Sequence, residues 1–374
     1  MIKLKKNILL QNNKQKIVNK NILVRVDYNI DLKNKNFEDL YRIKESIPTI
    51  KFLLKNKANR IILITHIGRP KNKNDRKNLS TQNLIPLLKK FLPQVEYYKW
   101  HRGLEIPNKK LLILENIRFF KEEEQNDKKF ALQLSKLGDI FINEAFSVSH
   151  RKHSSIYQLK KILPTLYGFN FQKEIENLNK VLKIKRGLCL IIGGLKIETK
   201  LPLIKKFLTK AETIILVGGI ANTFLKAKGF NVGQSIIDKN YLNEARKISS
   251  SKILLPFDFV TNKNKEIYLG KIEKDEIIYD VGQQSIEYFK SEIKKAKCIV
   301  WNGPLGWIED KKYFRGSKLM AKFLASINNI KFAGGGETLS VINKLKLNNK
   351  FNFLSTGGGA MIYYLAYKKL PIFD

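Results

Sequence analysis

Short runs of Ile, Leu and Val recur along this chain, and helix-like stretches separate them. Nine runs have the length and composition of strands: 21–26, 60–65, 110–115 and 139–144 in the first half, and 188–194, 213–219, 298–303, 330–336 and 351–359 in the second. Near-continuous apolar strands that alternate with helices predict parallel sheets covered on both faces. The pattern therefore predicts an α/β fold built from doubly wound parallel sheets.

One stretch between the two groups of runs has the spacing of an amphipathic helix. In residues 171–186, the apolar positions Ile175, Leu178 and Leu182 recur at intervals of three and four. A chain of 374 residues also exceeds the usual size of a single domain. We expect two doubly wound parallel-sheet domains, at residues 1–170 and 184–353, joined by an interdomain helix at 171–183 and a hinge.

Two glycine triplets, Gly334 to Gly336 and Gly357 to Gly359, each follow an apolar run and precede a helix-like stretch. Glycine lets the backbone turn sharply and approach a ligand closely, and the free N–H groups at the start of a helix attract negative charge. Two such turns close together in the sequence suggest a polyphosphate site. The alternative is that each triplet is only a tight turn from strand to helix.

Polar side chains follow four of the first-half runs directly. Asp27 and Asn29 come after 21–26, His66 and Arg69 after 60–65, Arg118 after 110–115, and His150, Arg151 and His153 after 139–144. Arg42 opens the helix-like stretch between the first two runs. Because ligands bind at the carboxyl ends of strands in such sheets, we expect these residues to line one pocket.

Arginine is scarce in this chain, with 11 residues against 59 lysines, yet four of the arginines belong to this set. A guanidinium group binds phosphate or carboxylate through two parallel hydrogen bonds, which an ammonium group cannot reproduce. We therefore expect a small ligand that carries phosphate and carboxylate, with Asp27 and Asn29 bonded to its hydroxyl group. For each residue taken alone, a surface ion pair or a capped turn is the alternative.

The second half carries a different set of residues after its runs. Lys196 and Lys200 follow a Gly-Gly turn, and a spacing of four on a helix would let both ammonium groups reach one polyphosphate. For Lys200 alone, the alternative is one lysine among 59. The further candidates for this nucleotide site are Gly218, Gly219, Asn302, Pro304 and Glu309, the last as an acceptor for ribose hydroxyls.

Several familiar nucleotide and catalytic motifs are absent from the sequence. There is no GxxxxGK[ST], no GxGxxG and no pair of HRD and DFG, so the P-loop, dinucleotide-binding and protein-kinase interpretations lose their main support. A serine nucleophile elbow and a zinc-type cluster of His and Cys are absent as well. With a phosphate pocket in one domain and a polyphosphate pocket in the other, direct phosphoryl transfer is the simplest chemistry.

The formal net charge of +37 raises nucleic acid as a partner, because lysine and arginine neutralise phosphates. Here, however, the basic residues are spread along the whole chain and accompany abundant Asn and Ile, as in the codon usage of an AT-rich genome. We therefore expect no specific nucleic-acid partner. Nucleic-acid binding as a main or added role is the alternative, and binding that vanished at physiological salt would reduce it to nonspecific electrostatics.

Neither a membrane segment nor a disulfide framework is indicated. No apolar run reaches the 18 residues that suggest a membrane helix, and the N-terminus lacks the apolar segment and cleavage site of a signal peptide. A cytoplasmic location is expected. Cys189 and Cys298 lie within apolar runs, where free cysteine usually behaves as a small hydrophobic residue.

Eleven sequence blocks, taken in order, resemble those of the phosphoglycerate kinase family over essentially the full chain. They are RVDYN, RIKESIPTI, THIGRP, LENIRFF, NEAFSVSHRKHSS, GGLKIETK, GGIANTF, LPFDFV, WNGPLGWIE, GGGET and STGGGA. No single block is decisive, but eleven in register are highly specific. The resemblance implies a glycolytic phosphotransferase that moves a phosphoryl group reversibly between 1,3-bisphosphoglycerate plus ADP and 3-phosphoglycerate plus ATP, with Mg²⁺, in a hinge-bending monomer.

The resemblance also implies a role for each residue at a motif position. Binding of 3-phosphoglycerate is implied for Asp27, Tyr28, Asn29, Arg42, His66, Ile67, Gly68, Arg69, Arg118 and Arg151. Nucleotide binding is implied for Lys196, Lys200, Gly218, Gly219, Asn302, Pro304, Glu309, Gly335, Gly336, Glu337 and Thr338. Arg42 and Lys196 would be catalytic, Glu337 would hold the metal, and the backbone of Gly357, Gly358 and Gly359 would meet the transferred phosphate. The segment 354–374 is expected to return to the N-terminal domain.

One departure from the family pattern bears on function. Glu337 stands where the family usually carries Asp, and its longer side chain changes the position of the carboxylate relative to Mg²⁺. A catalytically weakened, nucleotide-binding relative of the family is therefore the alternative function. The sequence leaves the choice between adenine and guanine nucleotides open.

Overall fold

The computed structural model describes residues 1–31, 37–72, 74–101 and 105–374, with side chains outside 37–39. The chain divides into two compact units, which are unit 1, Met1–Asn177 with Lys369–Asp374, and unit 2, Leu178–Lys368. Helix α7 (Phe169–Lys183) contains the boundary between them, and it begins two residues before the helix expected at 171–186. None of the helices within the described ranges is long and apolar enough to cross a membrane.

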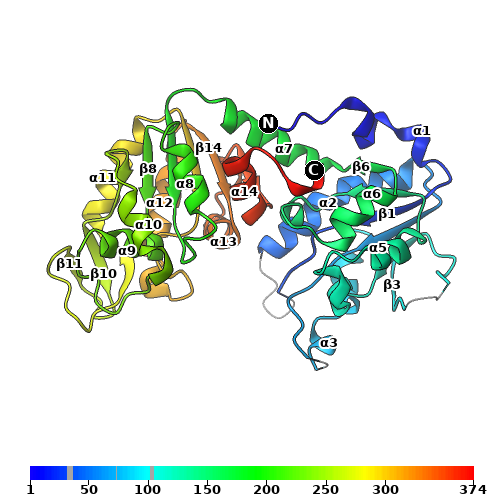
Figure 1. Cartoon of the computed structure of the whole chain (residues 1–374), viewed down its shortest axis with the longest axis horizontal. Helices are drawn as coiled ribbons and strands as arrows, with labels where there is room; N and C mark the ends of the chain where they lie inside the picture. Colours follow the sequence, from blue (N-terminus) through cyan, green and yellow to red (C-terminus); the bar gives the residue numbers. More distant parts are fainter. Residues whose placement is uncertain (32–36, 73, 102–104) are drawn as a thin grey trace. The chain divides into compact units, whose positions relative to one another are not determined.

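Unit 1 is built on a six-stranded parallel sheet with the order β3-β4-β2-β1-β5-β6 (Figure 1). Its strands are β1 (Asn21–Arg25), β2 (Arg60–Ile64), β3 (Val95–Tyr98), β4 (Leu111–Leu114), β5 (Ile140–Asn143) and β6 (Thr165–Tyr167). Its helices, besides the first part of α7, are α1 (Lys14–Ile17), α2 (Phe37–Lys55), α3 (Asp75–Asn78), α4 (Ile85–Leu88), α5 (Lys128–Ser135) and α6 (Leu159–Ile162).

Both faces of the unit 1 sheet are apolar, which explains the continuous hydrophobic runs. In β1, Ile22 and Val24 belong to one core cluster, whereas Leu23 between them belongs to another. Successive side chains of a strand point to opposite faces, so an unbroken apolar run supplies two cores at once. The parallel doubly wound arrangement expected from the sequence is confirmed for this unit.

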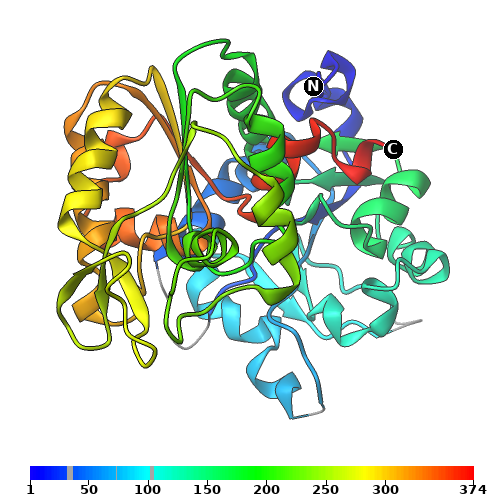
Figure 2. The same ribbon diagram turned by 60° about the vertical axis from the view of Figure 1, so that its left-hand side comes forward.

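Unit 2 repeats the architecture with a six-stranded parallel sheet of the order β15-β14-β13-β7-β8-β9, and Figure 2 shows helices on both sides of its strands. The strands are β7 (Leu188–Ile192), β8 (Thr213–Leu216), β9 (Ile253–Leu254), β13 (Cys298–Asn302), β14 (Ile330–Gly334) and β15 (Phe353–Ser355). The helices are α8 (Leu201–Phe207), α9 (Gly218–Ala227), α10 (Leu242–Lys247), α11 (Gln283–Lys294), α12 (Arg315–Ser326), α13 (Gly336–Lys344) and α14 (Gly359–Tyr367).

A second, antiparallel sheet in unit 2 has no counterpart among the expected strands. It consists of β10 (Asp258–Thr261), β11 (Glu266–Tyr268) and β12 (Ile278–Val281), with β10 in the centre. Phe259 of β10 packs into a small apolar cluster with Leu225 of α9. This sheet forms one wall of the cavity described below.

All nine strands expected from the sequence are present, and most end between one and four residues before the apolar run does. The polar or glycine residues at the ends of those runs lie beyond the strands, in the turns that follow them. The expectation of a helix across Lys196 and Lys200 is wrong, because α8 begins only at Leu201 and both lysines lie in the turn before it. Pro202 in the first turn of α8 fits this start, since proline lacks an N–H group and is tolerated in the first turn of a helix but not in its interior.

The C-terminal residues are divided between the two units. Residues 354–368, including α14, belong to unit 2, and α14 packs against α8. The last six residues belong to unit 1, where the Phe373 ring stacks on Tyr167 at a centroid distance of 5.2 Å and Lys160 donates to the Ile372 carbonyl. The domain boundaries inferred from the sequence stay a prediction.

Candidate functional site

The polar residues expected in unit 1 follow four strands that are neighbours in the sheet. Parallel pairing joins β4 to β2, β2 to β1 and β1 to β5, so the carboxyl ends of all four lie at one edge. Asp27, His66, Arg118 and Arg151 follow these ends, with Arg118 in the short 3₁₀ helix Ile117–Phe119. The topology therefore delivers the expected residues to the same side of unit 1.

Asp27 organises the first part of this edge. Its Oδ2 accepts from Arg42 Nη1 at 3.0 Å and from Ser147 Oγ at 2.5 Å, and its Oδ1 accepts from the Asn29 amide at 3.2 Å. Arg42 Nη1 also donates to the Asn29 carbonyl oxygen at 3.3 Å. Asp27 and the Asn29 carbonyl together thus hold Nη1 of the Arg42 guanidinium in place.

Gly68 links Asn29 to Arg118. The Gly68 amide donates to Asn29 Oδ1 at 2.8 Å, and its carbonyl oxygen accepts from Arg118 Nη1 at 2.8 Å. Gly68 has a φ of +60°, and an added Cβ would lie 2.9 Å from the Leu79 side chain, so both backbone geometry and space favour glycine here. The neighbouring Ile67 side chain is buried in the core.

Three arginines form a cluster of like charge. Burial, followed by the charges of Arg151 and Arg69, lowers the pKa of Arg118, although Glu124 at 3.3 Å opposes the shift. Burial and the charge of Arg69 likewise lower the pKa of Arg151. Arg118 Nη2 is buried without a hydrogen-bond partner among the described residues. Cations held together in this way disfavour one another, and an anion bound among them would remove that cost.

The imidazole of His66 lies beside this cluster, almost fully buried. Arg25 Nη2 is 2.8 Å from His66 Nδ1, and Arg25 is itself fully buried at the end of β1. Burial and the charge of Arg25 place the pKa of His66 well below its usual range. Tyr28 is also fully buried, with its hydroxyl 2.8 Å from Ser46 Oγ, so its side chain serves the core.

In unit 2 the expected residues again follow adjacent strands. The pairs β8 with β7, β7 with β13 and β13 with β14 are all parallel, and each of these four strands leads into a glycine-containing turn. Gly193 donates its amide to the Asn302 carbonyl oxygen at 2.8 Å, which ties two of the turns together. Asn302 Nδ2 in turn donates to the Gly334 carbonyl oxygen at 2.7 Å. Thr338 Oγ1 accepts from the Gly303 amide at 2.7 Å.

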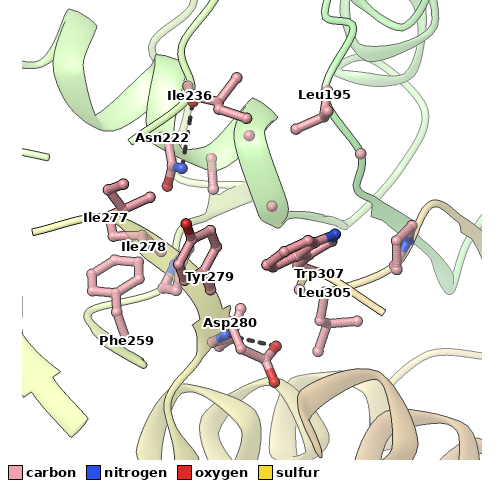
Figure 3. A pocket seen from close by; sticks show the side chains of 18 of the residues that line it. Leu195, Asn222, Ile236, Phe259, Ile277, Ile278, Tyr279, Asp280, Leu305 and Trp307 are labelled. Atoms are coloured by element: carbon pink, nitrogen blue, oxygen red, sulfur yellow. Dashed lines mark hydrogen bonds between the residues drawn. The ribbon is translucent and has the colours of Figure 1, made fainter. Parts of the chain in front are cut away.

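These turns border a cavity of about 450 Å³, and Figure 3 shows the side chains that line it. Five residues expected at the nucleotide site belong to the lining: Gly218, Gly219, Pro304, Glu309 and Glu337. The remaining wall is mainly apolar and includes Phe259, Ile278 and Tyr279 from the antiparallel sheet. Trp307 also lines the cavity and is 46% exposed, and its ring lies 5.2 Å from that of Tyr279 between centroids.

Both glycine triplets lead directly into helices. Gly335, with a φ of +95°, precedes α13, and Gly358, with a φ of +45°, precedes α14. An added Cβ at Gly335 would lie 2.9 Å from Asn302 Nδ2. In the described residues, no N-cap side chain bonds to either helix start, and the Ala360 amide in α14 donates to the Gly357 carbonyl oxygen at 2.8 Å. The start of a helix attracts negative charge. The helix starts predicted from the triplets are confirmed.

The two lysines expected at this site differ in their surroundings. Lys200 Nζ donates to the Gly193 carbonyl oxygen at 2.5 Å, whereas Lys196 is exposed. Burial lowers the pKa of Lys200 to about 8, and the charge of Glu337 partly offsets that effect. Lys200 is therefore a cation near the glycine turns whose charge changes near neutral pH.

Glu337 is the residue expected to hold a metal ion. It is exposed in the first turn of α13 and borders the cavity. No group of three or more His, Cys, Asp or Glu side chains in the described ranges could hold a metal by itself. Mg²⁺ commonly binds through one carboxylate together with substrate phosphates and water, and an exposed Glu337 fits that mode.

Several residues with a place in these sites were missed in the sequence. Arg25 reads as the polar end of a strand, and Ser147 as a loop residue. Tyr279 belongs to no quoted block. Trp307 lies in the block WNGPLGWIE, of which only Asn302, Pro304 and Glu309 were expected at the site. Cys189 and Cys298 are free and buried in adjacent strands, as expected for small hydrophobic residues.

Comparisons with known proteins agree with this geometry. The phosphoglycerate kinase family model matches residues 12–368. A phosphoglycerate kinase from Dictyoglomus turgidum is 39% identical over 375 aligned positions, and the alignment covers 94% of each chain. One from Pelotomaculum thermopropionicum is 36% identical over 373 positions and covers 94% of this chain and 95% of the relative.

Solved structures are similar over the same length. A phosphoglycerate kinase from Pyrococcus horikoshii superimposes with a TM-score of 0.84 at 29% identity, covering 98% of this chain and 97% of the other. One from Coxiella burnetii gives a TM-score of 0.79 at 30% identity and covers 95% of both chains. The order of the blocks, the two parallel sheets and these matches lead to one conclusion: the chain belongs to the phosphoglycerate kinase family.

Proposed function

We propose that this protein is an active glycolytic kinase that transfers a phosphoryl group reversibly between 1,3-bisphosphoglycerate plus ADP and 3-phosphoglycerate plus ATP. The observation that carries the proposal is the pairing of two different anion sites, one in each unit. Unit 1 offers clustered guanidinium groups, and unit 2 offers uncapped helix starts beside an apolar cavity. The family membership of the chain supports the same reaction.

In unit 1, 3-phosphoglycerate would be held by charge and by directed hydrogen bonds. Arg69, Arg118 and Arg151 would neutralise its phosphate and carboxylate, since guanidinium groups bind both in a bidentate manner. Asp27 and Asn29 would bond the hydroxyl group, and Gly68 keeps Asn29 and Arg118 in register. Arg42, already held by Asp27, would approach the reacting carboxylate.

In unit 2, the nucleotide would place its base in the apolar part of the cavity and its phosphates at the glycine turns. Glu309 would accept from the ribose hydroxyls, and Lys196 and Lys200 would contact the phosphates. Gly335, Gly336 and Thr338 would shape the turn at the start of α13. The backbone of Gly357, Gly358 and Gly359 would face the transferred group.

Phosphoryl transfer in this arrangement needs no covalent intermediate. The transition state spreads charge over the equatorial oxygens, so catalysis consists mainly of positioning and electrostatic stabilisation. Arg42 and Lys196 would stabilise that charge together with the N–H groups of the glycine turns. Mg²⁺, held by Glu337 and the nucleotide, would neutralise phosphate charge when bound.

Transfer between two substrates requires them to meet, so we also propose that the units close around them as a hinge-bending monomer in the cytoplasm. Closure would exclude water, which would otherwise hydrolyse the acyl phosphate. A smaller radius of gyration in solution scattering with both substrates than with either one would support this. An unchanged radius with both substrates would contradict it.

A coupled assay with 3-phosphoglycerate and Mg·ATP tests the reaction itself. We expect turnover in the wild type and a large loss of kcat in Arg42→Ala and Lys196→Ala. Glu337→Asp serves as a matched control for the metal site. A rate within about tenfold of the wild type would show that catalysis does not depend on the longer side chain of Glu337. Folded wild-type protein without turnover at saturating substrates would contradict the proposal.

A further inference from the structure

Arg25 makes three hydrogen bonds inside unit 1. It begins the block RVDYN but was not among the expected site residues. Its Nη1 donates to the Val26 carbonyl oxygen at 2.6 Å, and its Nε donates to Ser155 Oγ at 3.0 Å. Its Nη2 lies 2.8 Å from His66 Nδ1. The guanidinium is fully buried, so each contact has a fixed geometry.

A buried carboxylate holds this arginine in place through Ser155. Glu123 accepts from the Ser155 amide at 2.9 Å and from Ser155 Oγ at 2.6 Å. Since that hydroxyl gives its proton to Glu123, its oxygen is left to accept from Arg25 Nε. Glu123 is fully buried, and its negative charge also balances that of Arg25. Ser155 and Glu123 therefore fix both the position and the charge of Arg25.

The direction of the bond between Arg25 and His66 follows from the chemistry of arginine. A guanidinium group has five donors and no acceptor. Nδ1 of His66 must therefore accept, which it does only when it carries no proton. A neutral imidazole with an unprotonated Nδ1 has its proton on Nε2.

The positive surroundings of His66 oppose a second proton on the ring. Burial lowers the pKa of His66 most, and Arg25, Arg118, Arg151 and His153 lower it further. No other hydrogen-bond partner of the ring is found among the residues that the structure describes, so the Nε2–H group remains for a ligand.

We propose that Arg25 is a positioning residue that holds His66 in the neutral, Nε2-protonated tautomer, so that the ring offers the substrate one directed N–H donor rather than a further positive charge. The inference depends on the proposed function only in naming the ligand as 3-phosphoglycerate. The nearby arginines supply positive charge that attracts an anion, whereas the neutral imidazole supplies one hydrogen bond of fixed direction. Substrate binding should then stay independent of His66 ionisation across neutral pH.

Nitrogen-15 NMR of the imidazole side chains tests the tautomer directly in the full-length protein. The chain has only four histidines, and His66→Gln identifies the resonances of His66. In the wild type at pH 7, we expect Nε2 to show the shift of a protonated nitrogen and Nδ1 that of an unprotonated one. A His66 imidazolium, or a proton on Nδ1, would overturn the proposal.

Two variants distinguish the effect of Arg25 on the His66 tautomer from the effect of Glu123. Arg25→Met with Glu123→Gln removes both buried charges at once, which protects folding. It should allow a mixture of tautomers, because the donor that requires an unprotonated Nδ1 is lost. Glu123→Gln alone keeps Arg25 and should leave the tautomer unchanged. An unchanged tautomer in the double variant, or the same change in the single one, would overturn the assignment to Arg25.

Kinetics with 3-phosphoglycerate test the use of the donor. A glutamine at position 66 can place its amide nitrogen near the site of Nε2, whereas an asparagine places its own near Nδ1. His66→Gln should raise KM less than fivefold, and His66→Asn by about ten- to a hundredfold, with kcat less affected in both. Equal KM values in the two variants would refute the donor role. If no variant and no wild-type sample turned over, the proposed function would fail while the NMR result still decided the tautomer.

Discussion

The two units differ in the kind of anion site that they offer. Unit 1 gathers side-chain charges, with burial and the charge of neighbouring arginines lowering the pKa of Arg118 and of Arg151. Unit 2 relies on backbone, with glycine turns that open into the helices α13 and α14 and an apolar cavity beside them. Under the proposed function, side chains would recognise the small substrate and backbone would recognise the phosphates of the nucleotide.

This difference has a physical origin in the size of the ligands. A small ligand with two anionic groups offers little surface, so charge and bidentate hydrogen bonds must supply its affinity. A nucleotide adds a base with apolar faces, and stacking in a cavity supplies part of its affinity. We therefore expect unit 1 to respond to changes of charge and unit 2 to changes of backbone shape and apolar contact.

The largest effect is expected for Arg118→Met. Loss of charge-assisted bonds to an anionic ligand, each worth about 1.5–3 kcal/mol, should lower kcat/KM for 3-phosphoglycerate by about a hundred- to a thousandfold. The free energy of unfolding should change by less than about 1 kcal/mol, because relief of like-charge repulsion offsets the lost bonds. Chemical denaturation and the coupled assay measure the two quantities. Arg76→Met, an arginine of unit 1 outside the cluster, is the control and should leave both unchanged.

Gly335→Ala probes the backbone site in unit 2. A side chain at a φ of +95° strains the turn by about 1–3 kcal/mol, and its Cβ would press on Asn302. We expect the KM for Mg·ATP to rise by about ten- to a hundredfold, with little change for 3-phosphoglycerate.

Gly229→Ala is the matched control for that substitution. Gly229 has a φ of +93° but no atom within 4 Å of an added Cβ, and it lies away from the cavity lining. It should cost some stability and leave the KM for Mg·ATP unchanged. If both variants raised KM equally, backbone strain in general, and not the shape of this turn, would be responsible.

Trp307→Ala tests the apolar part of the cavity. Loss of a ring that can stack on the base should weaken nucleotide binding about tenfold, as measured by calorimetry with ADP. Trp307→Phe should retain most of the affinity. Unchanged affinity for ADP in the alanine variant would show that stacking on Trp307 does not contribute to nucleotide binding. The expected role of apolar contact in unit 2 would then be contradicted.

The smallest effect is expected from pH. Because Lys200 has a pKa of about 8, it is mainly charged at pH 7 and mainly neutral at pH 9, so the KM for Mg·ATP should rise several-fold over that interval. In Lys200→Arg the rise should disappear, because arginine stays protonated throughout. An identical pH profile in wild type and variant would assign the change to another group.

Much of the fold could be predicted from the sequence because parallel strands covered on both faces leave an unbroken apolar run. β1 and β7 are of this kind, with nearly every residue buried. β3 (VEYY) was not recognised, because it mixes exposed and buried residues over only four positions. The antiparallel β10 to β12 were not recognised either, because each has only three or four residues and β11 is largely exposed.

The candidate sites were predictable where one residue type has a rare chemical ability. Arginines in a lysine-rich chain and glycines in triplets stand out, and the structure brings them to the expected strand ends. Arg25 did not stand out, because its importance lies in the partner it meets across the sheet, 41 positions later in the chain. Lys200 was noted for the wrong reason, since its position follows from Pro202 and not from a helix face.

The division of unit 1 between the two ends of the chain affects how the protein is made. Residues 369–374 pack within unit 1, where Phe373 stacks on Tyr167, yet the ribosome must first synthesise all of Leu178–Lys368. At about 5–20 residues per second, that interval lasts on the order of ten to forty seconds. For this time the nascent unit 1 lacks its last segment, so the N-terminal half emerges first but is completed last.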